Sequence, residues 1–108
     1  MHGKMEQVGK FILLKDSVIS GKTAIALGGE KGFVLDGTIL DNVTFQDATV
    51  IYKGAGPLKM HNVRFINCQF VVPLSSQGNQ LLTALAEPVV SVQIGEIPPD
   101  LIQRIRLP

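Results

Sequence analysis

Residues 40–50 read Leu-Asp-Asn-Val-Thr-Phe-Gln-Asp-Ala-Thr-Val, and residues 60–70 repeat the pattern as Met-His-Asn-Val-Arg-Phe-Ile-Asn-Cys-Gln-Phe. The apolar positions and the Asn or Asp positions recur after twenty residues, and a further shift by twenty aligns Asp16 with Asp36. One such unit is too thin to bury its own apolar face, so successive units must stack to make a core. The repeat therefore predicts stacked β-strands.

Within each unit, apolar residues occur in pairs that are two residues apart, as strand alternation requires. Each pair starts five residues after the one before it, beginning at Phe33 and ending with Phe70. The pattern fails at residues 53–57 and 73–78, which are rich in Gly, Pro and Ser. We expect loops at both places.

An Asn or Asp residue precedes each of four apolar pairs, at Asn42, Asp47, Asn62 and Asn67. These side chains tolerate left-handed backbone angles and bond to neighbouring amides at a bend. We expect Asn42 to lie over Asn62, and Asp47 over Asn67, as ladders that hold the corners of the stack.

The pattern predicts an all-β fold, namely a short right-handed single-stranded parallel β-helix of about three coils with a C-terminal helix and strand cap. We expect residues 1–10 to form an N-terminal segment, in part attributable to an expression vector. Residues 11–77 are expected to form the coils, and residues 78–108 a capping or docking arm. Within that arm, residues 79–86 have a helix-forming composition and residues 89–94 alternate as a strand does.

Three motifs carry a resemblance to known proteins: Asn-Val-Thr-Phe at 42–45, Asn-Val-Arg-Phe at 62–65 and Asn-Cys-Gln-Phe at 67–70. They resemble the right-handed parallel β-helices of short bacterial proteins. The beat of five is similar to that of pentapeptide-repeat proteins, whereas the looped side and the large Phe33 are similar to the pectate-lyase and polygalacturonase superfold. Pentapeptide-repeat proteins usually carry Asp or Asn directly before the central apolar residue, and this chain has Thr or Arg there in the first two motifs. The resemblance implies a fold and no particular activity.

Composition excludes several classes of function. Ten basic and nine acidic residues give a net charge of +1, which does not favour DNA, RNA or an anionic membrane as a partner. No apolar run reaches the roughly 18 to 20 residues of a membrane span. Cys68 is the only cysteine, which favours a reducing, cytoplasmic setting and offers no zinc-binding pattern. No glycine-rich loop matches a nucleotide fingerprint, so we expect neither a metal nor a cofactor.

Catalytic residues are not indicated either. Cleavage of a glycosidic bond needs two carboxyl groups on one face, whereas Asp36, Asp41 and Asp47 are expected at different corners. Asp41 and His61 would stack on adjacent strands, with Lys59 and Arg64 close in sequence, and these four residues form the candidate ligand site.

Aliphatic residues at the alternating, outward positions are Ile51, Ile66 and Val71. A soluble monomer rarely leaves such a patch open, so we expect a homo-oligomer or a partner protein to cover it. The sequence therefore favours a non-enzymatic structural, oligomerisation or protein-interaction module. The alternative is a small-molecule or carbohydrate-binding protein, or a degenerate carbohydrate-active β-helix.

Overall fold

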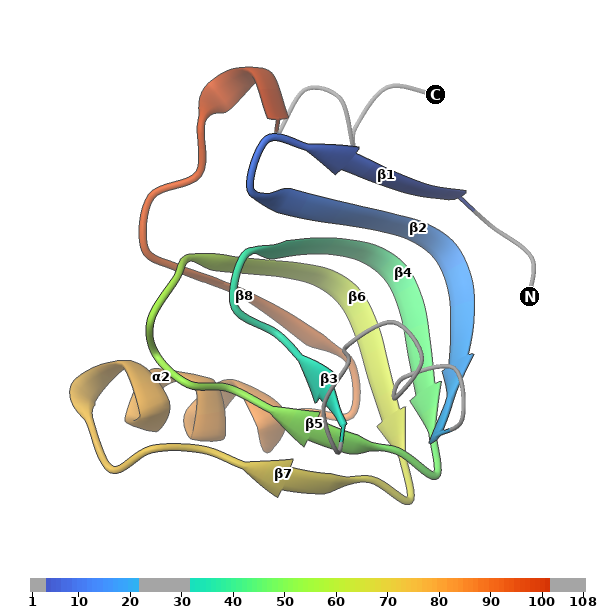
Figure 1. Ribbon diagram of the computed structural model, residues 1–108. Helices are drawn as coiled ribbons and strands as arrows, with labels where there is room; N and C mark the ends of the chain where they lie inside the picture. The colour runs from blue at the N-terminus through green and yellow to red at the C-terminus, as the bar shows by residue number, and fades with distance from the viewer. Residues whose placement is uncertain (1–3, 22–31, 102–108) are drawn as a thin grey trace.

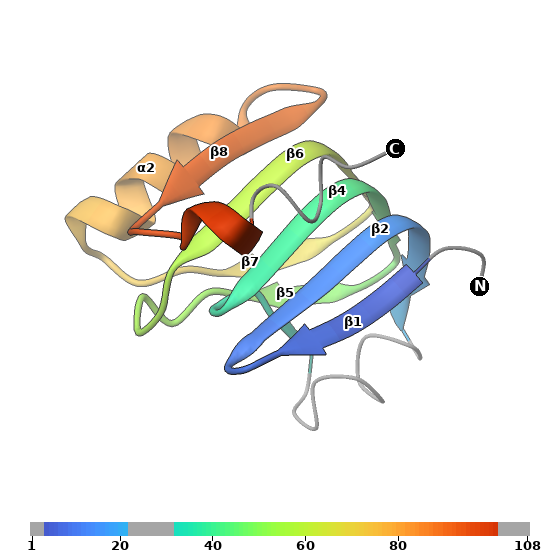
Figure 2. The ribbon, with the colours of Figure 1, turned by 90° about the horizontal axis from the view of Figure 1, so that it is seen from above.

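The computed structural model describes residues 4–21 and 32–101 (Figure 1). Its larger sheet has five strands in the order β1-β2-β4-β6-β8. Their bounds are Lys4–Val8 for β1, Phe11–Ser20 for β2, Thr38–Gln46 for β4, Leu58–Ile66 for β6 and Val90–Ile94 for β8. The three central strands run parallel, while β1 and β8 run antiparallel to their neighbours at the two edges. The order can be followed along the row of strands in Figure 2.

A second, smaller sheet contains three short parallel strands in the order β3-β5-β7. They span Phe33–Val34, Thr49–Ile51 and Gln69–Val71. In Figure 1 this sheet lies below the larger one and runs across its lower end. The one helix labelled there, α2, spans Ser76–Leu85.

The predicted all-β β-helix is wrong. The strands form two open sheets, the larger one mixed in direction, and no closed solenoid, so the chain is a small mixed α/β domain. The physical reason lies at residues 53–57, which form no fourth strand. The Asp36 carboxylate accepts hydrogen bonds there from the backbone amides of Lys53, Ala55 and Gly56, at 2.7, 2.7 and 3.1 Å. After one more parallel unit, formed by β6 and β7, the chain turns into α2 and the antiparallel β8 instead of a further coil.

The spacing of twenty residues is nevertheless the register of the parallel strands. Leu40 pairs with Met60 between β4 and β6, and Val50 pairs with Phe70 between β5 and β7. The first unit differs, because β2 pairs with β4 at a separation of 26 residues and Asp16 bonds to Asn42. The alignment of Asp16 with Asp36 was therefore wrong.

The apolar pairs fill the space between the sheets. Leu40, Val43, Phe45, Val50 and Leu58 are among the fully buried core residues, as strand alternation predicts. Aromatic rings run through this core, since Phe45 contacts Phe33 with a centroid distance of 5.1 Å and stacks on Phe65 at 5.2 Å.

Each bend of the parallel strands is held by a ladder of Asn and Asp side chains. In the part of the chain that the structure describes, five residues other than glycine have a left-handed φ, between 51° and 56°: Asp16, Asn42, Asp47, Asn62 and Asn67. The Asn42 amide bonds to Asp16 at 2.7 Å, the Asn62 amide to Asn42 at 3.1 Å, and the Asn67 amide to Asp47 at 2.7 Å. Both predicted corner ladders are confirmed.

The C-terminal part of the described chain covers two surfaces. Ser75 caps α2 by accepting a hydrogen bond from the Gly78 amide at 3.0 Å, and Leu81 of this helix is fully buried in the core. Beyond β8, Ile97 and Leu101 pack on Leu13 and Ile39, on the outer face of the larger sheet. The segment therefore covers apolar positions of its own chain, although not those predicted as an interface.

Candidate functional site

The predicted ligand site includes one close polar pair. Asp41 lies opposite His61 in the register of β4 and β6, and His61 Nδ1 is 2.8 Å from Asp41 Oδ1. The His61 side chain is 68% exposed and that of Asp41 is 21% exposed. The contact orients the imidazole and leaves its second nitrogen, Nε2, free to meet solvent or a ligand.

The structure does not gather the other two predicted residues around this pair. Lys59 comes two residues before His61 in β6, and its Nζ lies 3.5 Å from Oε1 of Gln93 in β8. Arg64 lies opposite Thr44, beyond the bend at Asn62. Only Asp41 and His61 of the four are therefore joined by a contact.

The Asp41–His61 pair lies on an open surface. Ser91 of β8 is close by, but its Oγ accepts a hydrogen bond from the Asn62 amide at 3.2 Å. Within residues 4–21 and 32–101, no three His, Cys, Asp or Glu side chains lie together so that they could hold a metal ion. The pair therefore presents an oriented imidazole on an exposed surface, a geometry suited to hydrogen bonding with a polar group.

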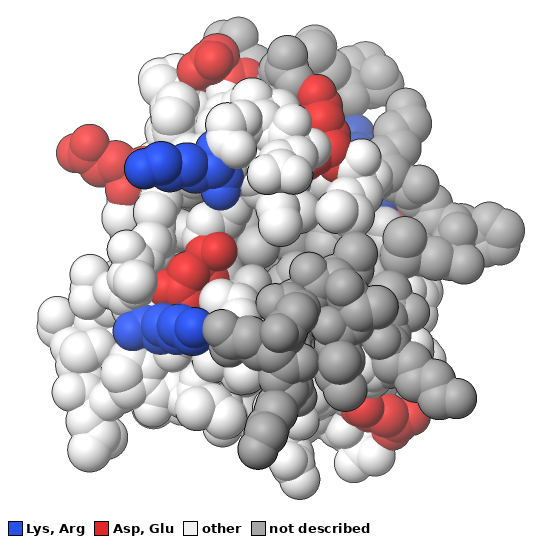
Figure 3. Space-filling model, viewed as in Figure 1, with Lys and Arg blue, Asp and Glu red and all other residues white. Residues whose placement is uncertain are grey.

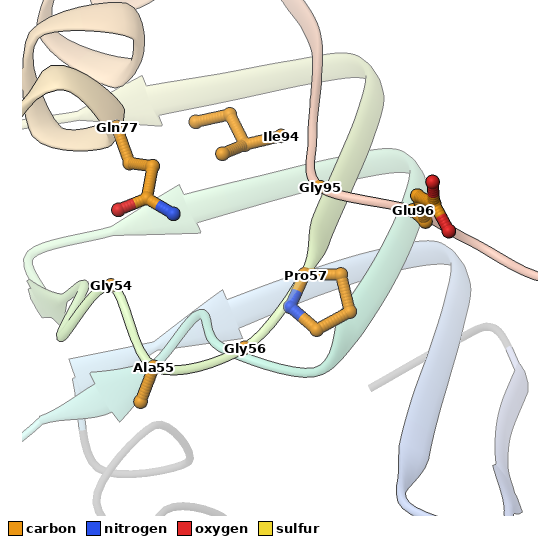
Figure 4. Close-up of a pocket in the computed structure, with 8 residues that line it drawn as sticks. All are labelled: Gly54, Ala55, Gly56, Pro57, Gln77, Ile94, Gly95 and Glu96. Carbon is orange, nitrogen blue, oxygen red and sulfur yellow. The ribbon is translucent and has the colours of Figure 1, made fainter.

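A shallow hollow of about 260 Å³ lies elsewhere, between the loop at 53–57 and the end of β8 (Figure 4). Gly54, Ala55 and Gly56 run along it, and Gln77 of α2 extends toward them in the figure. Glu96 points to the outside. The hollow is lined by glycine backbone, the Gln77 carboxamide and the apolar side chains of Pro57 and Ile94, and it holds none of the four predicted ligand residues.

The predicted interface residues belong to two different sheets. Ile51 and Val71 are neighbours in the register of β5 and β7, and Val34 of β3 completes an outward aliphatic row. Val71 is 55% exposed, whereas Ile51 is partly buried. Ile66 is 51% exposed but lies in β6, on the other side of the corner at Asn67.

Sequence reasoning missed Phe70. The beat of five places it inward, and its ring does face the core, where it makes an edge contact with Phe65 at a centroid distance of 5.0 Å. It is still 36% exposed, because β7 is the last strand of its sheet and no further strand of the described chain lies on it. The signal in the sequence was the end of the repeat after Phe70, since the last copy of a stacked unit lacks a neighbour.

Among residues 4–21 and 32–101, no strand pairs with the outer side of the β7 backbone. The Gln69 amide donates to the Ala48 carbonyl at 3.0 Å, and the Val71 carbonyl accepts from the Tyr52 amide at 2.9 Å. Because the polar backbone groups of successive strand residues point to opposite sides, those of Phe70 point away from β5. Phe70 therefore presents a donor and an acceptor at the outer edge of the sheet.

This edge belongs to a long uncharged stretch. No Lys, Arg, Asp, Glu or His occurs between Arg64 and Glu87, a range that contains β7 and α2. In Figure 3 the lowest part of the left side is white, below a blue side chain that lies over the place where Figure 1 draws α2. Exposed aliphatic side chains lie in this range, Leu74 and Leu82 among them. We call Ile66, Phe70, Val71 and the outer edge of β7 the open edge.

Comparison of the chain with family models, with curated proteins and with solved structures found no match. In the described ranges, no helix has the length and apolar character needed to cross a membrane.

Proposed function

We propose that the protein is a non-enzymatic self-association module whose working surface is the open edge. The observation that carries the proposal is the combination of exposed Ile66, Phe70 and Val71 with a free strand edge in a stretch without charge. Proteins normally protect edge strands with Lys, Pro or a covering segment. Exposed apolar groups beside an unprotected edge are typical of a surface that is covered in the assembled state.

The partner we propose is a second copy of the same chain. A two-fold interface brings the same surface patch of both copies together, so any charge near the axis meets its own like charge. The residues of the open edge lie between Arg64 and Glu87, where the chain has no charged side chain. Two copies of these residues can therefore come together without repulsion between like charges of their own. Charged residues are also depleted at the centres of protein interfaces.

Two valines provide a matched test. Val71 is 55% exposed in β7, and Val18 is 50% exposed in β2. We expect the unmodified protein to sediment as a dimer at micromolar concentration, Val71→Lys as a monomer, and Val18→Lys as a dimer. A lysine at Val71 would place a like charge on each side of the interface, whereas one at Val18 would lie away from it.

A monomeric mass for the unmodified protein would overturn the proposal, as would a Val71→Lys protein that remains as dimeric as Val18→Lys. Binding of a different protein to the open edge of a monomer would also overturn self-association. Folding of both variants is checked by circular dichroism and thermal unfolding before the masses are compared.

The proposal includes a cytoplasmic location. Cys68 has no cysteine in its own chain with which to pair, and reducing compartments keep such thiols free. Cell fractionation tests this part, and recovery of the protein in a secreted or membrane fraction would contradict it.

A second candidate is a small-molecule or carbohydrate-binding surface around Asp41 and His61, favoured by their 2.8 Å contact. Charge-assisted hydrogen bonds of such pairs can orient a hydroxyl-rich ligand. If this function holds, titration of a panel of mono- and oligosaccharides will shift the backbone amide NMR signals of Asp41 and of the residues on either side of His61. Replacement His61→Ala will abolish the shifts, and Arg64→Ala, beyond the bend, will leave them. Absence of any shift in the unmodified protein would remove this candidate.

A further inference from the structure

The direction and register of the self-association can be derived from β7, and this inference rests on the proposed function. We infer that two copies pair their β7 strands antiparallel about a two-fold axis that passes beside Phe70. The two three-stranded sheets then become one continuous sheet, and the outer edge of each β7 is covered by that of the other copy.

The antiparallel direction follows from symmetry. A two-fold axis that joins two copies of the same strand edge to edge reverses the strand direction between them. A parallel arrangement would use two different edges and leave one of them open, which allows continued growth. A closed dimer through β7 is therefore antiparallel.

The register follows from the backbone hydrogen bonds. Gln69 and Val71 direct their backbone polar groups toward β5. The Gln69 amide donates to the Ala48 carbonyl at 3.0 Å, and the Val71 carbonyl accepts from the Tyr52 amide at 2.9 Å. Phe70 is the residue of β7 whose amide and carbonyl face outward. In an antiparallel pair, two opposed residues with this orientation exchange both hydrogen bonds. Phe70 of one copy therefore lies opposite Phe70 of the other.

The limits of the strand agree with this centre. Asn67 takes the left-handed corner conformation at one end, with φ 53°, and Pro73 has no amide to donate at the other. Phe70 lies midway between them, so a pair centred on Phe70 uses the available edge symmetrically. Any shift of the register brings the corner or the proline of one copy into the pairing region of the other.

The side chains fit the same arrangement. Phe70 faces the core side of the sheet and rests on Phe65 at 5.0 Å, so the two Phe70 rings would meet beneath the joined sheet and cover each other. On the outer face, Val71 of one copy lies beside Gln69 of the other, at a spacing of about 4.5 Å between Cα atoms. The interface thus places apolar rings inside and an uncharged pair outside.

Cysteine cross-linking tests the register while it keeps Phe70 in place. In a Cys68→Ser background, Gln69→Cys and Val71→Cys are made as separate proteins. When the two are mixed and oxidised, we expect a disulfide between Cys at position 69 of one copy and Cys at position 71 of the other. Each protein oxidised alone should give no cross-link, because like positions are then displaced by two residues and lie beyond the roughly 7 Å limit for a disulfide.

Sedimentation of the reduced proteins separates the two levels of the proposal. Dimers that cross-link in the mixture and not alone support the register. If the proteins are dimers but either one cross-links alone, the proposed register is wrong and self-association still holds. The same conclusion follows if the proteins are dimers and the mixture does not cross-link. Monomers of the unmodified protein overturn both.

Discussion

Asn42 and Asn62 share a hydrogen bond of 3.1 Å and the same left-handed backbone angle, φ 56°. The second residue repeats the first after one repeat unit, so the bend of β4 lies over the bend of β6. The side chain therefore has two tasks: it permits the strained angle and it joins one strand to the next.

Substitution of Asn42 separates these two tasks. Asn42→Gly keeps the left-handed angle without strain but removes the bonds to Asp16 and Asn62, and we expect a loss of about 1 to 2 kcal/mol in the free energy of unfolding. Asn42→Ala removes the same bonds and adds backbone strain, for a further loss of about 1 kcal/mol. Urea denaturation measures both, with exposed Gln46→Ala as the control. Equal stability of the Gly and Ala variants would contradict the role of the backbone angle.

Gly78→Ala should destabilise the protein although Gly78 lies in α2. In an exposed helix this change stabilises by about 1 kcal/mol. Here a Cβ atom would overlap the Pro73 carbonyl oxygen and press on Val72. We therefore expect a loss of about 1 to 3 kcal/mol, the usual effect of overpacking. Thermal unfolding tests the sign, with exposed Gln80→Ala as the neighbouring control; an increase in stability would show that the helix start moves freely.

Asp36→Asn should loosen the loop at 53–57. The carboxylate uses both oxygens to accept amides of Lys53, Ala55 and Gly56, whereas a carboxamide has one acceptor and would turn an N–H group toward a donor. We expect a loss of about 1 to 3 kcal/mol.

Hydrogen exchange at the three amides checks the origin of that loss. They should exchange faster in Asp36→Asn, and they should keep their protection when the exposed Asp100 is changed to Asn. Unchanged exchange in Asp36→Asn would mean that other contacts hold the loop.

Tyr52 should resist ionisation. Its side chain is buried, its hydroxyl has no hydrogen-bond partner in the described structure, and burial followed by the negative charge of Asp36 raises its pKa above the ordinary value of about 10. Because Tyr52 is the only tyrosine and tryptophan is absent, alkaline titration of tyrosinate absorbance reports on this residue alone. A midpoint at or below 10 in the folded protein would contradict the burial.

The same shift sets a dependence of stability on pH. Below about pH 10 the phenol is neutral in both states, and its contribution to stability is fully present; as the pH rises through 10 toward the folded-state pKa, the unfolded chain ionises first and stability falls. Tyr52→Phe should remove this part of the alkaline loss. At neutral pH the same variant should be as stable as the unmodified protein or slightly more stable, because it removes an unpaired buried hydroxyl.

The sequence predicted the local geometry well. Alternation identified the buried pairs, the spacing of twenty identified the register of β4 with β6, and the Asn and Asp positions identified the bends. It did not predict how the sheets end, because alternation describes the two faces of a strand and not its neighbours. The hydrogen bonds of Asp36 to a loop 17 to 20 residues away and the antiparallel pairing of β8 depend on contacts that no local pattern records.

The same limit applies to the candidate sites. The contact of Asp41 with His61 follows from the register, which the repeat reveals. Arg64 is separated from the Asp41–His61 pair because the bend at Asn62 lies between His61 and Arg64. The exposure of Phe70 depends on the absence of a following strand in the described chain, and a pattern that treats all copies alike cannot distinguish its last member.

The antiparallel strands β1 and β8 make the number of parallel strands between them adjustable. Each central parallel strand pairs with one neighbour along each of its two edges. Duplication of residues 47–66 would therefore insert one more layer and leave β1 paired with β2 and β8 paired with a copy of β6. The Asn and Asp ladders would gain one rung each, and the core one more set of apolar pairs. A gene encoding such a chain can therefore lengthen or shorten in whole units while both ends of the larger sheet keep their original partners.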